Sequence, residues 1–247
     1  MESRVILNTK TSKNCNHFSQ LEAKLKNYKV IYIPSLKINA IKYSQEESYN
    51  INDYDIAIFL SKNAVKYVQH NQNWRQTKII AVGPSTALAI KKYLKTDATY
   101  PSNNFSSAGI ADMLALQDIS TKKIVILTGS ENNGLLAAKL ETRALATTTL
   151  KIYKTSINYS STKILAKLTS VAAITSFSCN SLLALEKLIV TSNNNSLKNC
   201  PLLVISKKMK LLALSLGFSN NILVADNATT VAVTDCLENY LKEQQHG

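Results

Sequence analysis

The fold is decided by one short stretch, Ile56-Ala57-Ile58-Phe59-Leu60-Ser61-Lys62-Asn63, which is typical of a buried strand that ends in a polar turn and continues into a helix. The same order of features returns later in the chain, where Val171-Ala172-Ala173-Ile174-Thr175 leads through Ser178-Cys179-Asn180 into a second helical stretch. Self-similarity on this scale indicates repeated structural units. We therefore expect two copies of one α/β domain, each with a polar strand-to-helix turn at the copied position.

The segments that follow extend the repeat. Each copy continues with a second apolar strand and a polar turn, Ile79–Val82 before Gly83-Pro84-Ser85-Thr86 and Leu202–Ile205 before Ser206-Lys207-Lys208. Strands that alternate with helices of about 10–15 residues are typical of a parallel sheet with crossover helices. The sequence thus predicts the α/β class, with a parallel sheet in each domain.

The two copies are interlaced along the chain. Hydrophobic periodicity predicts strands over 4–9, 30–33, 55–60, 78–82, 123–128, 171–176, 202–206 and 222–225, and helices over 17–28, 62–70, 85–94, 107–116, 134–141, 162–168, 180–189, 207–215 and 229–242. Two connectors of alternating polarity, 36–41 and 149–158, bracket the middle copy and are expected to pair as a two-stranded linker. The predicted parse is a discontinuous outer domain, 1–35 and 159–247, with an inner domain, 42–148, inserted into it.

Length and composition set broad limits. The chain has 247 residues, of which 45% are hydrophobic, enough for two domains of about 120 residues with sizeable cores. The sequence shows no secretory signal and no apolar run of the roughly 18–20 residues that a membrane span needs. We expect a cytoplasmic protein with no membrane partner.

The net charge of +13 has two readings. A basic surface can attract nucleic acid, a membrane or an acidic small molecule. However, the 29 basic residues include only three arginines, Arg4, Arg75 and Arg143, and a lysine-rich bias of composition would give the same charge without any binding role. No long basic cluster interleaves with aromatic residues, so we expect no nucleic-acid partner.

Metal and nucleotide chemistry have little support. The four cysteines, Cys15, Cys179, Cys200 and Cys236, are far apart and form no CxxC pair, and only three histidines are present. The stretch 129–134 has the GxxxxG spacing of a phosphate-binding loop, but Leu135 and Leu136 replace the Lys-Ser/Thr that would bind phosphate and magnesium. The sequence therefore predicts no metal and no cofactor.

What remains is a set of polar helix starts at the carboxyl ends of the strands, where ligands collect in such sheets. A helix N-terminus offers free N–H groups and a positive dipole end, so it binds anions. The hydroxyls of Ser61, Ser85, Ser178 and Ser206 can equally act as ordinary N-caps. Their number and shared placement favour a ligand with many negative groups, and two domains facing across a hinge would place both sets around one cleft.

Several of these pieces together resemble one known family. They are Ile58–Val65, Ala81–Ala87, Pro101 with Phe105–Ile110, Ile126–Gly129, Ile152–Thr155 and Ala225–Thr229. In this order and at this spacing, they resemble uroporphyrinogen-III synthase over nearly the full length of the chain. The resemblance implies two flavodoxin-like domains joined by a two-stranded linker. It also implies a cofactor-free reaction, in which linear hydroxymethylbilane loses its hydroxyl and closes with its last pyrrole ring inverted.

The resemblance also suggests roles for individual residues. Tyr153 matches the tyrosine that the family favours for assisting loss of the hydroxyl, although a linker aromatic that merely packs on a domain would look the same. The substrate bears eight carboxylates, and the residues expected to hold them are Ser61, Asn63, Gly83, Ser85, Thr86, Thr128, Gly129, Ser178, Asn180 and Ser206. One departure concerns the outer domain, where many members repeat a Gly-Pro-x-Thr-Ala turn and this chain has Ser206-Lys207-Lys208-Met209.

Two functions follow from the same parse. The first is a hydroxymethylbilane cyclase of tetrapyrrole and heme biosynthesis, a lyase that removes water from its substrate. We expect this enzyme to act as a monomer and to receive its substrate by transient hand-over from the preceding enzyme. The alternative is a non-catalytic hinged two-domain protein that closes on an anionic metabolite. The fold alone does not separate them, and Tyr153 in the connector favours the enzyme.

Overall fold

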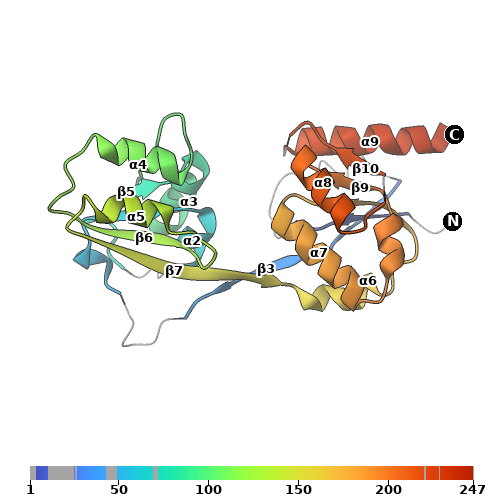
Figure 1. Ribbon diagram of the computed structural model, residues 1–247, viewed down its shortest axis with the longest axis horizontal. Coiled ribbons are helices and arrows are strands. Elements are labelled where there is room, and N and C mark those ends of the chain that lie inside the picture. The colour runs from blue at the N-terminus through green and yellow to red at the C-terminus, as the bar shows by residue number, and fades with distance from the viewer. Residues whose placement is uncertain are drawn as a thin grey trace. The chain divides into compact units, whose positions relative to one another are not determined.

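The computed structural model describes residues 4–10, 25, 27–42, 49–68, 72–219, 221–227 and 229–246. The chain divides into two compact units, one formed by Met1–Lys37 with Ser156–Gly247 and the other by Ile38–Thr155. In the described part of the chain, each unit is built around one five-stranded sheet (Figure 1). The predicted α/β class is confirmed, while the helix predicted over 17–28 lies almost wholly outside the described residues.

The first unit has the sheet order β10-β9-β8-β1-β2. Its strands are β1 (Val5–Asn8), β2 (Lys29–Tyr32), β8 (Val171–Thr175), β9 (Leu202–Val204) and β10 (Ile222–Val224). All the pairs in it are parallel. Counted along the unit, this is the 2-1-3-4-5 order of flavodoxin-like sheets. Its helices are α6 (Thr162–Leu165), α7 (Cys179–Thr191), α8 (Lys207–Ser215) and α9 (Thr230–His246), with short 3-10 turns at Tyr159–Ser161 and Asn195–Asn199.

The second unit has the order β3-β7-β6-β4-β5. Its strands are β3 (Leu36–Ala40), β4 (Ile56–Phe59), β5 (Lys78–Ala81), β6 (Lys123–Gly129) and β7 (Ala146–Ile157). The four strands β5, β4, β6 and β7 are parallel and repeat the order 2-1-3-4, and β3 takes the outer place. Its helices are α2 (Lys62–Tyr67), α3 (Pro84–Leu94), α4 (Ser107–Ala115) and α5 (Leu135–Glu141), after a 3-10 turn at Ile51–Asp53.

The two connectors pair as expected. The Ile41 N–H donates to the Ile152 carbonyl at 2.9 Å, and the Asn158 N–H donates to the Ser35 carbonyl at 2.9 Å. Residue numbers rise along β3 as they fall along β7, so the two strands are antiparallel. The division between the compact units falls within both strands. The predicted pairing of the connectors is therefore confirmed.

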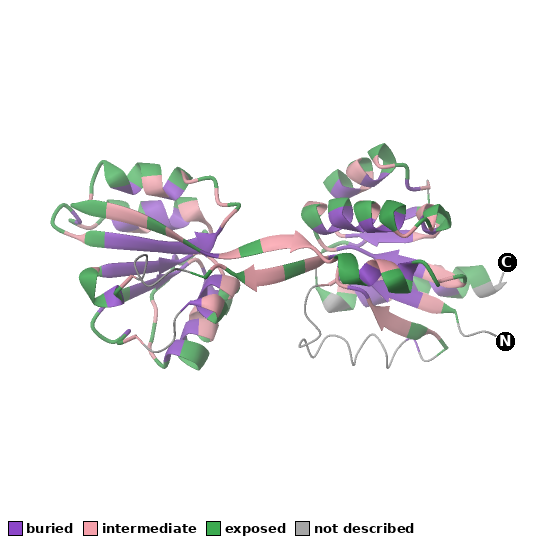
Figure 2. Ribbon diagram, turned by 90° about the horizontal axis from the view of Figure 1, so that it is seen from below, coloured by how far each residue is buried: buried purple, intermediate pink, exposed green. Residues whose placement is uncertain are grey.

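The central strands of both sheets are buried on both faces (Figure 2), which explains why these strands are continuous apolar runs. In the second unit, Ala57 and Phe59 pack with α2 and α3, whereas Ile56 and Ile58 pack with α4 and α5. In the first unit, one face lies against α7 and α8 and the other against α9. The central strands are thus held rigidly, and their polar carboxyl ends are held with them.

Candidate active site

Tyr153 lies on β7 where that strand bulges beside the end of β6. Thr128 pairs with Lys151, but Gly129 pairs with Tyr153, so Ile152 is an extra residue on β7. The Ile152 side chain is buried in the core, and the Ser130 N–H donates to the Tyr153 carbonyl at 2.8 Å, which continues the pairing past the bulge. A bulge re-aims a side chain, and this one places Tyr153 at the carboxyl edge of the sheet.

The Tyr153 ring lies directly over Gly129. A Cβ at position 129 would lie 2.7 Å from Cζ, 2.8 Å from Cε2 and 3.0 Å from the hydroxyl oxygen of Tyr153. These separations are shorter than ordinary contact, so any side chain at 129 would displace the ring. The glycine that the sequence predicts as a carboxylate contact is therefore also the residue that makes room for Tyr153.

Ser61 meets Tyr153 across β6. Its Oγ lies 3.1 Å from the Tyr153 hydroxyl oxygen, and it accepts a hydrogen bond from the Ala64 N–H at 3.0 Å. Ser61 is thus the N-cap of α2, as one reading of the sequence predicts. Asn63, another predicted site residue, is the second residue of this short helix and is half-buried.

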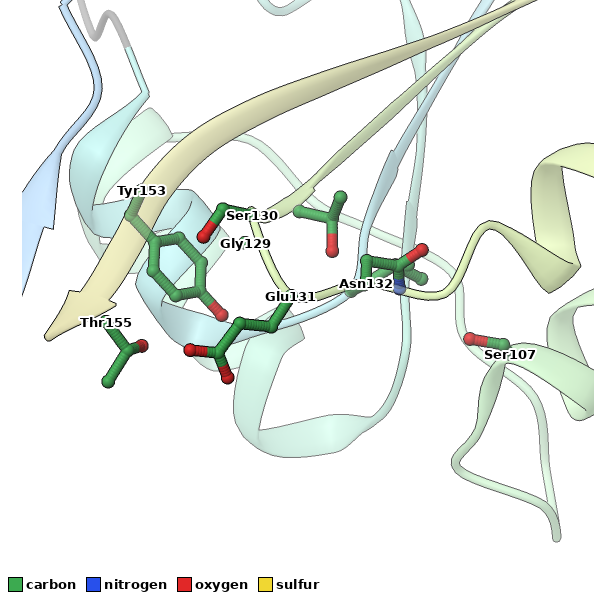
Figure 3. A pocket seen from close by; sticks show the side chains of 9 residues that line it. Ser107, Gly129, Ser130, Glu131, Asn132, Tyr153 and Thr155 are labelled. Carbon is green, nitrogen blue, oxygen red and sulfur yellow. The ribbon is translucent and has the colours of Figure 1, made fainter. Parts of the chain in front are cut away.

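A pocket of about 260 Å³ opens beside these residues (Figure 3). It is lined by Leu60, Ser107, Thr128, Gly129, Ser130, Glu131, Asn132, Tyr153 and Thr155. Figure 3 shows the Tyr153 hydroxyl and the Glu131 carboxylate both on the pocket side. Of the predicted site residues, the pocket brings together Thr128, Gly129 and Tyr153. Its walls are mostly hydroxyl, amide and backbone groups, which suit a polar ligand.

The prediction from the sequence does not include five polar residues that line this pocket. Ser130, Glu131 and Asn132 belong to the turn after β6, which lacks the residues of a phosphate-binding loop and for that reason is not among the predicted site residues. Its place directly after a buried strand was a usable signal. Thr155 also had a signal, because it stands two residues after Tyr153 and so shares its face of the strand. Ser107, at the start of α4, had a signal too, because it lies within the motif piece Phe105–Ile110.

The start of α3 is the second polar edge of this unit. Gly83 is the N-cap in an extended conformation, Pro84 is the first helical residue, and the helix has no side-chain cap hydrogen bond. Ser85 is exposed inside the first turn, so its interpretation as an N-cap is wrong. Thr86 is almost fully buried, and its N–H donates to the Gly83 carbonyl at 3.0 Å. The uncapped turn of this helix is open to an acceptor from outside.

Two pieces of the family motif meet at this helix start. A Cβ at Gly83 would lie 3.0 Å from the Cβ of Phe105, so the loop before α4 packs closely on the glycine. The Phe105 side chain is half-exposed and contacts the Tyr100 ring edge-on, with centroids 6.3 Å apart. The spacing between the two motif pieces therefore corresponds to a direct contact.

The predicted residues of the first unit cap its helices. Ser178 Oγ accepts from the Ser181 N–H at 3.1 Å at the start of α7, and Ser206 Oγ accepts from the Met209 N–H at 3.3 Å at the start of α8. Asn180 is exposed in the first turn of α7. These two helices follow the neighbouring strands β8 and β9, so their starts lie at one edge of that sheet. The N-cap reading of both serines is confirmed.

Buried hydroxyl groups support the start of α7, a feature that the sequence analysis missed. Ser181 Oγ lies 2.8 Å from Ser35 Oγ and 3.1 Å from Thr9 Oγ1, and all three side chains are buried. Because they are partnered with one another, the three hydroxyls join β1, α7 and the segment before β3. They fix the position of the helix start to which Ser178 and Asn180 belong.

Metal clusters and membrane-spanning helices are absent from the described residues. Within those ranges, no group of three or more His, Cys, Asp or Glu side chains is placed to hold a metal ion. No helix there is both long enough and apolar enough to cross a membrane.

Comparisons with known proteins place this geometry in a family. The family model described as uroporphyrinogen-III synthase HemD matches residues 19–235. The chain is 28% identical over 198 residues to the uroporphyrinogen-III synthase of Escherichia coli strain K12 and 26% identical over 198 residues to that of Salmonella typhimurium strain LT2, and each alignment covers 76% of this chain and 80% of the relative.

Solved structures show the same fold. A uroporphyrinogen-III synthetase from Helicobacter pylori 26695 superposes with a TM-score of 0.60 at 14% identity, covering 97% of this chain and 99% of that one. A mutant uroporphyrinogen III synthase from the extremely thermophilic bacterium Thermus thermophilus gives a TM-score of 0.56 at 11% identity, covering 99% of this chain and 100% of that one. At these identities the likeness concerns the fold alone.

Proposed function

The chain belongs to the uroporphyrinogen-III synthase family, and from this premise we propose how its own residues carry out the family's reaction. The protein is a uroporphyrinogen-III synthase, a hydro-lyase of tetrapyrrole biosynthesis. Family membership decides against the alternative of a non-catalytic binding protein. The substrate that the family implies is hydroxymethylbilane, whose eight carboxylates and reactive hydroxyl define what the site must hold.

Tyr153 assists the departure of the substrate hydroxyl in this proposal. The supporting observation is that its phenol stands at the wall of the pocket, over a glycine and beside Ser61. The electron-rich pyrrole breaks the C–O bond and the electron pair leaves with oxygen, which takes a proton from the phenol and departs as water. The substituted carbon of the last pyrrole ring forms the new bond and carries no hydrogen. Its bond to the original methylene bridge then breaks, and that methylene re-bonds to the unsubstituted carbon on the other side of the ring, whose proton is released and restores the phenol. The net change is loss of one water.

The carboxylates of the substrate are held by backbone N–H groups and hydroxyls at the carboxyl ends of the strands. In the second unit, the proposed contacts are Asn63, Gly83, Ser85, Thr86, Thr128 and Gly129, and in the first unit they are Ser178, Asn180 and Ser206. The uncapped first turn of α3 supports the first group. Pro84 has no N–H and the Thr86 N–H donates to the Gly83 carbonyl, so the donor that this turn offers is the Ser85 N–H, which has no intrahelical acceptor. Thr86, being buried, contributes chiefly by fixing the turn. Ser61, predicted with this set, has the Tyr153 hydroxyl as its partner instead.

Binding of so many carboxylates makes catalysis mainly a matter of positioning. The closing ring must attack a hindered substituted carbon, and holding the reacting carbons close together replaces a costly encounter by an internal step. We further propose that the enzyme acts as a monomer in the cytoplasm and receives its unstable substrate by transient hand-over from the enzyme that makes it. These three points rest on the sequence alone.

The replacement Tyr153→Phe tests the proposal, because it keeps the ring and removes the donor. General acid assistance is typically worth 10²–10⁴-fold, and the reactivity of the pyrrole places the expected loss lower, at about 10–100-fold in kcat. The variant should still form the type III isomer, only more slowly. A kcat equal to that of the wild type, in a protein shown to be folded, would remove Tyr153 from the mechanism.

A further inference from the structure

The contact between Ser61 and Tyr153 spans a whole strand. β4, which leads to Ser61, and β7, which carries Tyr153, lie on opposite sides of β6. Strands in a sheet are about 4.8 Å apart, so side chains on β4 and β7 start roughly 10 Å from one another. The Tyr153 ring covers this distance because it crosses Gly129, which offers no side chain, and its hydroxyl reaches Ser61 Oγ at 3.1 Å.

The two hydroxyls have only two hydrogens between them. A serine hydroxyl has one hydrogen and can accept through two lone pairs. Ser61 Oγ already accepts the Ala64 N–H through one lone pair. The direction of its single hydrogen therefore decides which of the two hydroxyls donates in the contact between Ser61 and Tyr153. If Tyr153 donated to Ser61, the phenol hydrogen would be occupied and could not reach the leaving hydroxyl. If Ser61 donates to Tyr153, the phenol hydrogen is left for the pocket.

We propose that Ser61 is a positioning residue, which donates its hydroxyl hydrogen to the Tyr153 oxygen and so directs the phenol hydrogen toward the leaving hydroxyl of the substrate. The chain of donors then runs from the Ala64 N–H through Ser61 and Tyr153 to the substrate, and each bond polarises the next. When the phenol gives up its proton, the same Ser61 hydrogen bond stabilises the phenolate. This inference rests on the proposed role of Tyr153.

The role differs from the one that the sequence predicts for Ser61. A direct contact with a substrate carboxylate would weaken binding when it is removed, so its loss would raise KM. A group that acts through Tyr153 would lower kcat and leave KM within about twofold. Since Ser61 also caps α2, any replacement has to be judged against the loss of a cap.

Three replacements of Ser61 separate these functions. Ser61→Thr keeps both the cap and the donor, and should retain kcat within about threefold. Ser61→Ala removes both, and should lower kcat about 5–20-fold, a part of the effect expected for Tyr153→Phe. Ser61→Asp keeps a strong cap but can only accept, so it occupies the phenol hydrogen. Its kcat should fall as far as that of Tyr153→Phe, and repulsion of the anionic substrate should appear separately, in KM.

Ser106 provides a matched control for the cap. It is the N-cap of α4, accepts the Gly109 N–H at 3.3 Å, and gives its own hydrogen to Asn104 Oδ1 at 2.6 Å. Ser106→Ala and Ser61→Ala should each lower the unfolding temperature by about 2–4 °C, as the loss of one cap predicts. Only Ser61→Ala should lower kcat.

A double mutant gives the decisive measurement. Steady-state rates are measured with hydroxymethylbilane for Ser61→Ala, Tyr153→Phe and the pair. If Ser61 acts through Tyr153, the pair should be no slower than Tyr153→Phe alone. Equal losses in both backgrounds, or a rise in KM at constant kcat, would overturn the inference and leave the role of Tyr153 intact. A wild-type rate for Tyr153→Phe would instead remove the proposed role of Tyr153, and with it this inference.

Discussion

The close packing of Tyr153 on Gly129 makes Gly129→Ala the most informative replacement. The new Cβ would lie 2.7 Å from Tyr153 Cζ, so the ring must retreat by about 0.7 Å to reach the 3.4 Å of ordinary contact. Position 129 does not have a positive φ, so alanine fits the backbone and the ring bears the whole change. A retreat of this size is enough to break the 3.1 Å contact with Ser61.

The expected result is a large loss of rate with a small loss of stability. A misplacement of about 1 Å can cost 10²-fold in rate, so we expect kcat to fall about 10–100-fold, as for Tyr153→Phe. Overpacking costs about 1–3 kcal/mol of unfolding free energy, and the half-buried ring can yield toward the pocket, which favours the lower end. Initial rates with hydroxymethylbilane and urea unfolding measure the two quantities.

A second glycine controls for the general effect of adding a methyl group. Gly217 has φ +80° and open space around its Cβ position, so Gly217→Ala costs stability through backbone strain and touches nothing. It should unfold more easily than the wild type at unchanged kcat. If Gly129→Ala kept the wild-type kcat, or if it slowed the Tyr153→Phe enzyme by the same factor as the wild type, the steric account of Tyr153 would be refuted.

Two further predictions concern the substrate carboxylates. Thr86→Ala removes a buried hydroxyl at the start of α3, where Thr86 contributes chiefly by fixing the turn, so its effect on the carboxylate contacts is indirect and KM should rise no more than about tenfold. An inactive but folded variant would assign Thr86 a larger role. If the net charge of +13 steers the substrate, kcat/KM should fall as the salt concentration rises, because exposed charges are screened over about 8–10 Å at physiological ionic strength. A kcat/KM that does not change with salt concentration would favour composition bias as the origin of the charge.

Most of the fold could be predicted because the pattern of apolar residues in the sequence indicates which segments are buried. The runs 56–59 and 124–127 are buried on both faces and were recognisable as central parallel strands. The predicted ends of strands and helices differ from the structure where a residue next to a strand serves as the N-cap or first residue of the following helix. The strand predicted over 202–206 stops at Val204, and Ser206 serves instead as the N-cap of α8, where its side chain accepts the Met209 N–H. Pro84 likewise begins α3 one residue earlier than predicted, since its fixed φ suits the first helical position.

The candidate site was harder to predict because its key relation is spatial. The sequence identifies Ser61, Gly129 and Tyr153 separately, but nothing in it shows that the ring crosses the glycine to reach the serine. That relation depends on the bulge at Ile152, which shifts β7 by one residue against β6. The turn 130–132 lacks a phosphate-binding motif and so is not predicted as part of the site, although a carboxylate needs only hydroxyl and N–H donors.

An isomer-resolved cyclisation assay tests the central claim most directly. The purified protein is supplied with fresh hydroxymethylbilane, the products are oxidised to porphyrins, and the type I and type III isomers are separated by chromatography. Without enzyme, the linear compound closes to the type I isomer, in which no ring is inverted. The account predicts that, with the protein present, hydroxymethylbilane closes to the type III isomer. Formation of type I alone, by a protein shown to be folded, would contradict it.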